Sequence, residues 1–132
     1  MGAQIRPYTD WDAAAVERIA SASEIQVVSF LGAEKAPLFV ATVDGEVVGC
    51  IWGVLEPTVD LDVAVDRGHR RKGLGRRLVY ETLSVYELTD REVTLTVTNP
   101  TMERIAAELG LMSDGQGNWQ GTISLPAKAR PT

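Results

Sequence analysis

Two apolar runs separated by a two-residue turn form the clearest pattern in the chain. Residues 38–43 and 46–55 are mostly apolar, and Asp44-Gly45 lies between them. Asp-Gly between two such runs is typical of a β-hairpin, because both turn residues tolerate a positive φ. The pattern therefore predicts a hairpin of two buried strands.

Shorter stretches on either side predict the remaining strands. Residues 58–65 and 92–98 alternate apolar with polar side chains, and many of their apolar residues are β-branched. Both properties are typical of strands. Further short strands are expected at 5–8, 111–113 and 119–125, the last two forming a second hairpin.

Three segments, residues 11–20, 73–88 and 100–109, have the spacing and end signals of helices. The first follows Thr9-Asp10, which suits an N-cap, and the third has Pro100 at its first position and Gly110 after its end. The residues expected to face the core are Trp11, Ala15 and Ile19 on the first helix and Leu74, Leu78, Leu83 and Tyr86 on the second.

The order of these elements predicts an α+β fold, a mixed sheet with helices on both faces, in a single domain over residues 1–132. Residues 21–37 are the least readable part, with either a second short helix over 25–31 or an irregular loop. Residues 126–132 are expected to form a loose tail.

Length and composition are those of a globular protein. The chain has 132 residues, of which 45% are hydrophobic and 23% charged, and this length suits one domain. No apolar run approaches the roughly 20 residues that span a bilayer, and the N-terminal residues lack the apolar region of a signal peptide. We therefore expect a cytoplasmic protein with no membrane partner.

Cys50 and His69 are the only cysteine and histidine in the sequence. A single cysteine excludes an internal disulfide, and these two residues leave no plausible zinc ligand set. We expect no metal, and we expect Cys50 to be a small residue of the core.

Positive charge is concentrated in one short stretch. The chain carries 13 Lys and Arg against 18 Asp and Glu, for a net charge of −5. Six of the 13 lie between positions 67 and 77, which leaves seven basic residues against 18 acidic ones elsewhere. A nucleic-acid binder is usually basic over a whole face, so we expect no nucleic-acid partner. A nucleic-acid site at residues 67–77 and a merely solvated helix start are the alternatives.

This basic stretch coincides with a strand, a glycine-containing loop and a helix start. Gly73 and Gly75 allow backbone N–H groups to approach a ligand, and the helix that follows directs its dipole and unpaired donors at the same point. Together they describe a cradle for a polyphosphate. The loop is neither a Walker A loop, which needs Gly-Lys-Ser/Thr, nor a dinucleotide loop, because Leu78 stands where a third Gly or Ala is required.

Residues 70–75, Arg-Arg-Lys-Gly-Leu-Gly, match the Arg/Gln-x-x-Gly-x-Gly/Ala loop of the GNAT superfamily of acyl-CoA N-acyltransferases. The resemblance includes the preceding Leu61-x-Val-x-Val65 strand and the later Asn99 and Leu109-Gly110-Leu111, and the order of elements agrees over about residues 3–125. It implies a GNAT-like fold, with a central, mostly antiparallel, six- to seven-stranded mixed sheet whose strands splay apart at the acyl-CoA site.

The resemblance also implies which residues hold acetyl-CoA. The backbone of Val63, Ala64 and Val65 would bind the pantetheine arm, and Asn99 would contact the arm from the next strand, unless Asn99 is a plain helix cap. The pyrophosphate would be held, chiefly through main-chain N–H groups assisted by basic side chains, by Arg70, Arg71, Lys72, Gly73, Leu74, Gly75 and Arg76.

The reaction implied is direct attack of an amine on the acetyl thioester. It needs a deprotonated amine, an N–H donor for the developing oxyanion and a proton for the departing thiolate. The donor would be a backbone N–H near Val65. The family often carries a tyrosine acid at the position that Ala106 occupies here, so this chain departs from the pattern at the proton donor.

Carboxylates on the motif strand are the candidates for the base. Asp60 and Asp62 alternate with apolar residues and so point to the same face; we favour Asp60, then Asp62, then Glu56. A simple hydrated strand end is the alternative interpretation. The strand before Asn99 carries Thr94 and Thr96 at the other common position and offers no base there.

Together these features predict an N-acetyltransferase that transfers the acetyl group of acetyl-CoA to a primary amine of an unidentified acceptor, a small molecule or a protein. The acidic composition favours a cationic acceptor. The alternative, prompted by Ala106, is a non-catalytic acyl-CoA-binding or regulatory protein of the same fold. Pairing of edge strands into a homodimer is possible.

Overall fold

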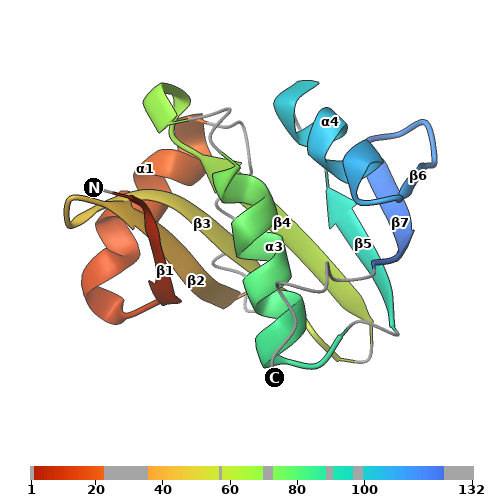
Figure 1. The fold of residues 1–132 in the computed structure, drawn as a ribbon, viewed down its shortest axis with the longest axis horizontal. Helices are drawn as coiled ribbons and strands as arrows, with labels where there is room; N and C mark the ends of the chain where they lie inside the picture. The colour runs from red at the N-terminus through yellow and green to blue at the C-terminus, as the bar shows by residue number, and fades with distance from the viewer. Residues whose placement is uncertain are drawn as a thin grey trace.

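A computed structural model describes residues 2–22, 36–56, 58–69, 73–88, 91–96 and 100–123. These residues form a seven-stranded sheet in the order β1-β2-β3-β4-β5-β7-β6 (Figure 1). Within it β4 and β5 run parallel, whereas the other neighbouring strands are antiparallel. The strands are β1 Gln4–Pro7, β2 Ala36–Val43, β3 Glu46–Val54, β4 Val59–Val65, β5 Glu92–Thr96, β6 Met112–Ser113 and β7 Asn118–Thr122.

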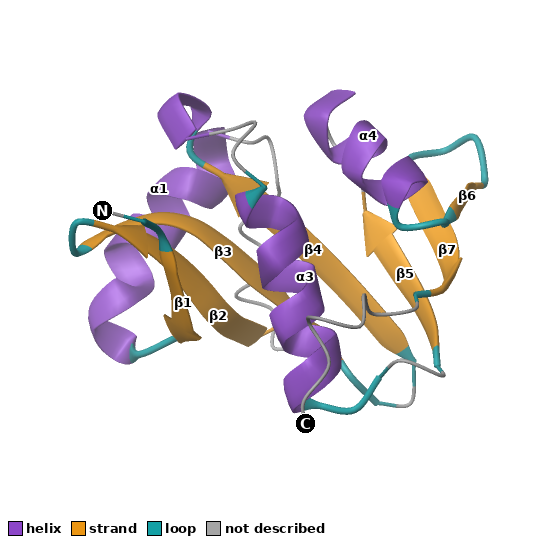
Figure 2. Cartoon of the chain, viewed as in Figure 1, coloured by secondary structure: helices purple, strands orange, loops and turns teal. Residues whose placement is uncertain are grey.

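Helices lie on both faces of the sheet, as predicted. One face carries α1 (Ala13–Ala22), which follows a 3-10 turn, η1 (Asp10–Asp12). The other face carries α3 (Leu74–Val85) and α4 (Pro100–Glu108), and α3 crosses in front of the sheet in Figure 2. A second 3-10 turn, η2 (Arg67–His69), follows β4. The predicted α+β fold with a mostly antiparallel mixed sheet is confirmed.

The larger core lies between the sheet and the pair α3 and α4. Alternate residues of β4 enter it, because successive side chains of a strand point to opposite faces. They meet buried leucines of α3 and apolar residues of α4. The principal members are Val59, Leu61, Val63, Val65, Leu74, Leu78, Leu83, Val93, Leu95, Met102 and Ala106.

The smaller core lies between α1 and the strands β2, β3 and β4. Val16, Ile19 and Ala20 of α1 pack there, and the buried strand residues are Val40, Val47, Cys50, Trp52 and Ala64. Cys50 is therefore a core residue, as expected. Burial raises the pKa of its thiol, so the side chain stays in the protonated, unreactive form.

The prediction for Trp11 was wrong. Its side chain is 96% exposed instead of lying on the buried face of a helix. The physical reason is the start of the helix, where Thr9 and Asp12 fix a 3-10 turn and α1 begins only at Ala13. The helical spacing therefore applies to Ile19 but cannot be extended back to Trp11.

The other predicted elements agree closely with the structure. The Asp44-Gly45 turn has φ values of 52° and 84°, which are those of a hairpin turn with two left-handed residues. The second predicted helix ends at Val85, so the helical spacing does not extend to Tyr86. The prediction that Tyr86 faces the core was therefore wrong: its side chain is 42% exposed, although its ring packs edge-on against Phe39. The predictions for residues 25–31 and 126–132 fall outside the described residues.

Within the described ranges, no helix is both long enough and apolar enough to cross a membrane.

Candidate functional site

The candidate site begins where β4 diverges from its partner β5 (Figure 1). The parallel pairing runs from Val59 opposite Val93 to Asp62 opposite Thr96. Beyond that point β4 stays paired with β3 as far as Val65. The ribbons of β4 and β5 diverge at this end (Figure 1). This divergence of the described parts of β4 and β5 is the splay that the sequence resemblance implied (Figure 1).

A glycine begins α3 beside this end of β4. Gly73 is the N-cap residue, and its φ of 78° lies in the left-handed region that favours glycine. Its carbonyl accepts the N–H of Arg77 at 3.0 Å, which starts the helix. A side chain at this position would meet nothing within 4 Å. The backbone conformation alone therefore calls for glycine here.

Gly75 has a packing reason of its own. A Cβ atom there would lie 2.8 Å from Cδ1 of Ile105 on α4 and 3.7 Å from Cγ1 of Val63 on β4. The first of these separations is too short, so the tip of Ile105 would have to move. Gly75 thus allows the first turn of α3 to approach both α4 and β4, in addition to any role toward a ligand.

Two of the basic residues near the helix start make contacts within the protein. Nη1 of Arg76 lies 3.0 Å from a carboxylate oxygen of Glu108 on α4. The Arg77 guanidinium donates to the carbonyl of Ala3 at 3.1 Å. The predicted ligand residues Arg70, Arg71, Lys72 and Asn99 lie outside the described residues.

On the α1 side of the sheet, the surface of β4, β5 and β7 carries two rows of polar residues. Asp60, Thr94 and Gln120 occupy neighbouring positions in the first row. The second row, one step nearer the splay, consists of Asp62, Thr96 and Asn118. Asp60 and Asp62 do share a face, as predicted.

The two aspartates differ in burial and position. Asp60 is partly exposed, whereas Asp62 is only 3% exposed. Asp62 lies opposite Trp52 of β3 and immediately precedes Val63. Of the two carboxylates, that of Asp62 is therefore attached nearer to the point where β4 and β5 separate.

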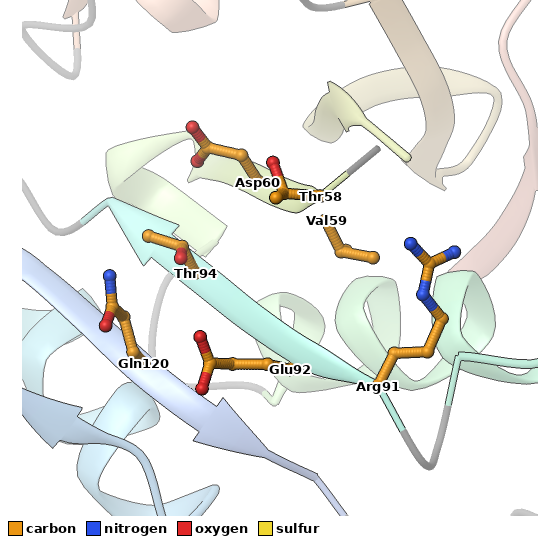
Figure 3. Close-up of a pocket in the computed structure, with 7 residues that line it drawn as sticks. All are labelled: Thr58, Val59, Asp60, Arg91, Glu92, Thr94 and Gln120. Atoms are coloured by element: carbon orange, nitrogen blue, oxygen red, sulfur yellow. The ribbon is translucent and has the colours of Figure 1, made fainter. Parts of the chain in front are cut away.

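The first row borders a pocket of about 470 Å³. Figure 3 shows Asp60, Thr94, Glu92 and Gln120 extending from three adjacent strands, and Arg91 reaching up beside Val59. The volume is within the range of small-molecule sites. The lining residues are Thr58, Val59, Asp60, Arg91, Glu92, Thr94 and Gln120.

Glu56, the third candidate base, lies outside this row. It follows β3, is 78% exposed and accepts a hydrogen bond from Nη1 of Arg91 at 2.9 Å. Glu56 is thus separate from the two aspartates of β4, and it forms an ion pair with Arg91, which lines the pocket.

A comparison with protein families found one decisive match. The model of the acetyltransferase (GNAT) domain matches residues 34–109, which is more than half of the chain. The chain belongs to the GNAT acetyltransferase family. The matched segment includes the β2–β3 hairpin and the whole of β4, α3, β5 and α4.

Solved structures share the GNAT fold over nearly the whole chain. Ard1 from Thermoplasma volcanium has a TM-score of 0.67 at 22% identity, covering 95% of this chain and 100% of its own. A GNAT acetyltransferase from Brucella melitensis, solved in complex with acetyl-CoA, has a TM-score of 0.64 at 19% identity, covering 95% and 92%. The putative acetyltransferase yncA from Salmonella typhimurium, with its cofactor acetyl-CoA, has a TM-score of 0.65 at 16% identity, covering 96% and 97%. A comparison with curated protein sequences found no match.

Glu92 and Gln120 line this pocket, although neither was predicted from the sequence. The strand before Asn99 was judged to offer no base because of Thr94 and Thr96, yet the same alternation places Glu92 on the same face. That signal was readable. Gln120 had no comparable signal, because its place depends on the pairing of β7 with β5.

Ala106, where the sequence resemblance implies that the family often has a tyrosine acid, lies in the interior of the protein. It is fully buried among residues of α3, α4 and the sheet, and its carbonyl accepts the N–H of Leu111 at 3.1 Å. A methyl group cannot donate a proton. Among the described residues, no group of three or more His, Cys, Asp or Glu side chains is placed to hold a metal ion.

Proposed function

We propose that this protein is an acetyl-CoA-dependent N-acetyltransferase acting on a primary amine. One observation carries the proposal: β4 diverges from β5 beside the glycine start of α3 (Figure 1), with carboxylates on the opposite face of the same strand. Two GNAT relatives of the same fold are structures with acetyl-CoA. The acyl donor and the acceptor would then approach β4 from two sides.

Acetyl-CoA fits the helix start and the splayed strand. The first N–H groups of α3, which follow the left-handed Gly73, have no partner within the helix and can donate to a pyrophosphate, which the helix dipole also favours. Arg70, Arg71, Lys72 and Arg76 would add charge, and the backbone of Leu74 and Gly75 would complete the loop. The backbone of Val63, Ala64 and Val65, with Asn99 from the next strand, would bind the pantetheine arm.

In the transfer, the amine nitrogen forms a bond to the acetyl carbon and the carbon–sulfur bond breaks. A backbone N–H near Val65 stabilises the oxyanion. Asp62, beside Val63, accepts the proton that the amine loses, directly or through water. The thiolate of CoA is a tolerable leaving group because thiols have a pKa of about 8.5. Water protonates it in place of the tyrosine that Ala106 replaces.

A second candidate function is acyl-CoA binding without turnover. Ala106 favours it, because a general acid typically contributes roughly 10²–10⁴-fold to a rate. The two functions differ in one measurable respect, the release of free CoA thiol in the presence of an amine.

The deciding experiment combines calorimetry with acetyl-CoA and a thiol-release assay with a panel of primary amines. We expect binding, and we expect amine-dependent thiol release. We expect Asp62→Asn to keep acetyl-CoA binding while lowering kcat by about 10²-fold or more. Asp44→Asn, in the exposed β2–β3 turn, is the matched control and should change neither.

Two results would reject the proposal in different ways. Absence of acetyl-CoA binding would reject the donor site itself. Binding without thiol release, for every amine tried, would leave the non-catalytic alternative.

A further inference from the structure

A single carboxylate lies where the chain leaves β4, directly before the basic stretch. Between Asp62 on β4 and Glu81 on α3, Asp66 is the only acidic residue in the sequence, and six basic residues follow it at positions 67–77. A carboxylate beside a site for a polyphosphate lowers the affinity of that site, because like charges repel. The charge of Asp66 therefore gives no reason for its place, whereas its contacts within the protein do.

The backbone of Asp66 joins the end of β4 to the turn that follows. Its N–H donates to the carbonyl of Val48 at 2.7 Å, which continues the pairing of β4 with β3 one residue beyond Val65. Its carbonyl accepts the N–H of His69 at 2.9 Å, which closes the 3-10 turn η2. Asp66 is thus held to the sheet on one side and starts the turn on the other.

The carboxylate of Asp66 also fixes this turn. Its Oδ1 accepts the backbone N–H of Arg67, the first residue of η2, at 3.1 Å. The first N–H groups of a helical turn have no partner within it, and a side-chain oxygen just before the turn commonly satisfies one of them. Oδ2 lies 3.6 Å from Nη1 of Arg18 on α1. These two side chains are 34% and 58% exposed, so the ion pair adds little, and the hydrogen bond from Arg67 is the more important contact.

The start of α3 is fixed at the other end of the basic loop (residues 70–75). Gly73 is its N-cap residue, and Gly75 packs closely against Ile105 of α4 and Val63 of β4. In the sequence only residues 70–72 separate this helix start from η2. Because three residues reach only a short distance, the direction in which η2 leaves β4 limits where the N–H groups and side chains of the loop can lie.

We propose that Asp66 is a positioning residue for acetyl-CoA: by fixing the direction of η2, it holds the basic loop toward the pyrophosphate. The proposal rests on the proposed function and adds a residue to its donor site. Asp66 acts through the N–H of Arg67 and makes no contact with the ligand. Its own charge opposes the pyrophosphate, so its charge and its hydrogen bond have opposite effects on affinity.

Asp66→Asn and Asp66→Ala separate these two effects. Both variants lose the negative charge, but only asparagine keeps a side-chain oxygen for the N–H of Arg67. We expect calorimetry to show that Asp66→Ala binds acetyl-CoA about fivefold more weakly than Asp66→Asn, the scale of one hydrogen bond. Asp66→Asn should bind at least as tightly as the wild type, because a repulsive charge is gone. Asp10→Asn and Asp10→Ala, at an exposed carboxylate of η1, are the matched controls and should bind equally.

A shortened donor distinguishes positioning of the loop from a general effect on the fold. S-acetylpantetheine has the thioester and the pantetheine arm of acetyl-CoA but no pyrophosphate. Relative to Asp66→Asn, Asp66→Ala should raise KM for acetyl-CoA about fivefold and leave kcat unchanged, while the two variants should use S-acetylpantetheine equally well. Urea unfolding checks that both variants are folded under the conditions of the assay. An equal loss with both donors would assign Asp66 to the fold alone and overturn the proposal.

Binding and turnover together separate the role of Asp66 from the proposed function. Equal affinity of Asp66→Ala and Asp66→Asn for acetyl-CoA, with thiol release by the wild type, would reject the positioning role and keep the enzyme. A fivefold difference in affinity without thiol release from any amine would reject the transferase and keep the positioning role. Absence of acetyl-CoA binding to the wild-type chain would reject both.

Discussion

Arg76 in the first turn of α3 forms an ion pair with Glu108 at the end of α4, with 3.0 Å between Nη1 and the carboxylate oxygen. Each residue alone is unfavourably placed for its helix, because a cation at an N-terminus and an anion at a C-terminus oppose the macrodipole. Their pairing offsets both effects and joins the two helices that flank the splayed strands. The ion pair also engages the guanidinium of Arg76, which the GNAT motif assigns to binding of the pyrophosphate.

Releasing Arg76 should strengthen the binding of acetyl-CoA. In Glu108→Gln the guanidinium loses its carboxylate partner and is free to turn toward the phosphates, so we expect Kd to fall by about two- to fivefold at low salt. Stability should change by less than about 1 kcal/mol, since the pair is half-exposed. Glu103→Gln on the same helix is the control. An unchanged Kd in calorimetry would mean that Arg76 does not serve the pyrophosphate.

Gly73 and Gly45 form a matched pair for testing the loop. Both have a positive φ, 78° and 84°, and a Cβ atom at either position would meet nothing within 4 Å. Replacing either by Ala should therefore lower the free energy of unfolding by a similar amount, about 1 kcal/mol. Gly73→Ala alone should weaken acetyl-CoA binding, by about tenfold or more, because it shifts the N–H groups of the helix start. Equal affinities in the two variants would remove Gly73 from the site.

Local signals in the sequence were enough to predict the strands that carry and flank the candidate site. The Asp44-Gly45 turn and the apolar runs beside it identify β2 and β3 without knowledge of the rest of the chain. The alternation of residues 58–65 places Asp60 and Asp62 on one face. Both features are set by residues adjacent in the sequence, through the backbone preferences of the turn residues and the two-residue period of a strand.

The pocket depended on contacts that no local pattern encodes. Gln120 reaches it because β7 inserts between β5 and β6, and the register of that pairing is fixed by packing across the sheet. Trp11 was misplaced for a related reason, since the contacts of Asp12 with Thr9 and Arg6 set where the helix begins. By contrast, the two-residue period of the strand is enough to predict that Glu92 lies on the same face as Thr94.

Two glycines of β3, Gly53 and Gly49, differ in how closely β4 packs against them. A Cβ atom at Gly53 would lie 2.5 Å from the carbonyl oxygen of Asp60 and 2.6 Å from Cδ2 of Leu61, whereas one at Gly49 would meet nothing closer than 3.3 Å. A backbone oxygen cannot retreat without moving β4. We expect Gly53→Ala to lower the free energy of unfolding by about 1–3 kcal/mol and to raise KM for the acceptor.

Gly49→Ala is the control on the same strand. We expect it to lower the free energy of unfolding by less than Gly53→Ala does and to leave KM for the acceptor unchanged. Denaturant unfolding and steady-state kinetics on both variants measure the two effects. Equal losses in the two variants would show that β3 and β4 tolerate a shift at Asp60.

Asp12 should make the stability of the fold dependent on acid pH. Its carboxylate accepts two hydrogen bonds of 2.8 Å from Arg6 and one from the N–H of Thr9 at 2.9 Å. The hydrogen bonds from Arg6 are the largest cause that lowers the pKa of Asp12, to about 2. An aspartate in the unfolded chain has a pKa of about 3.9. Because the folded pKa is the lower one, the stabilisation is present in full above about pH 4 and is lost as the pH falls toward 2.

Asp12→Asn should therefore lower the free energy of unfolding by about 2 kcal/mol at pH 7, and the difference from the wild type should shrink as the pH falls from about 4 to 2. Urea unfolding at a series of pH values measures it. Asp10→Asn, an exposed carboxylate in the same 3-10 turn, is the control and should show a much smaller change at every pH. A difference for Asp12→Asn that stays constant from pH 7 to pH 2 would assign its cost to lost packing, because only the charged pair with Arg6 disappears when the carboxylate is protonated.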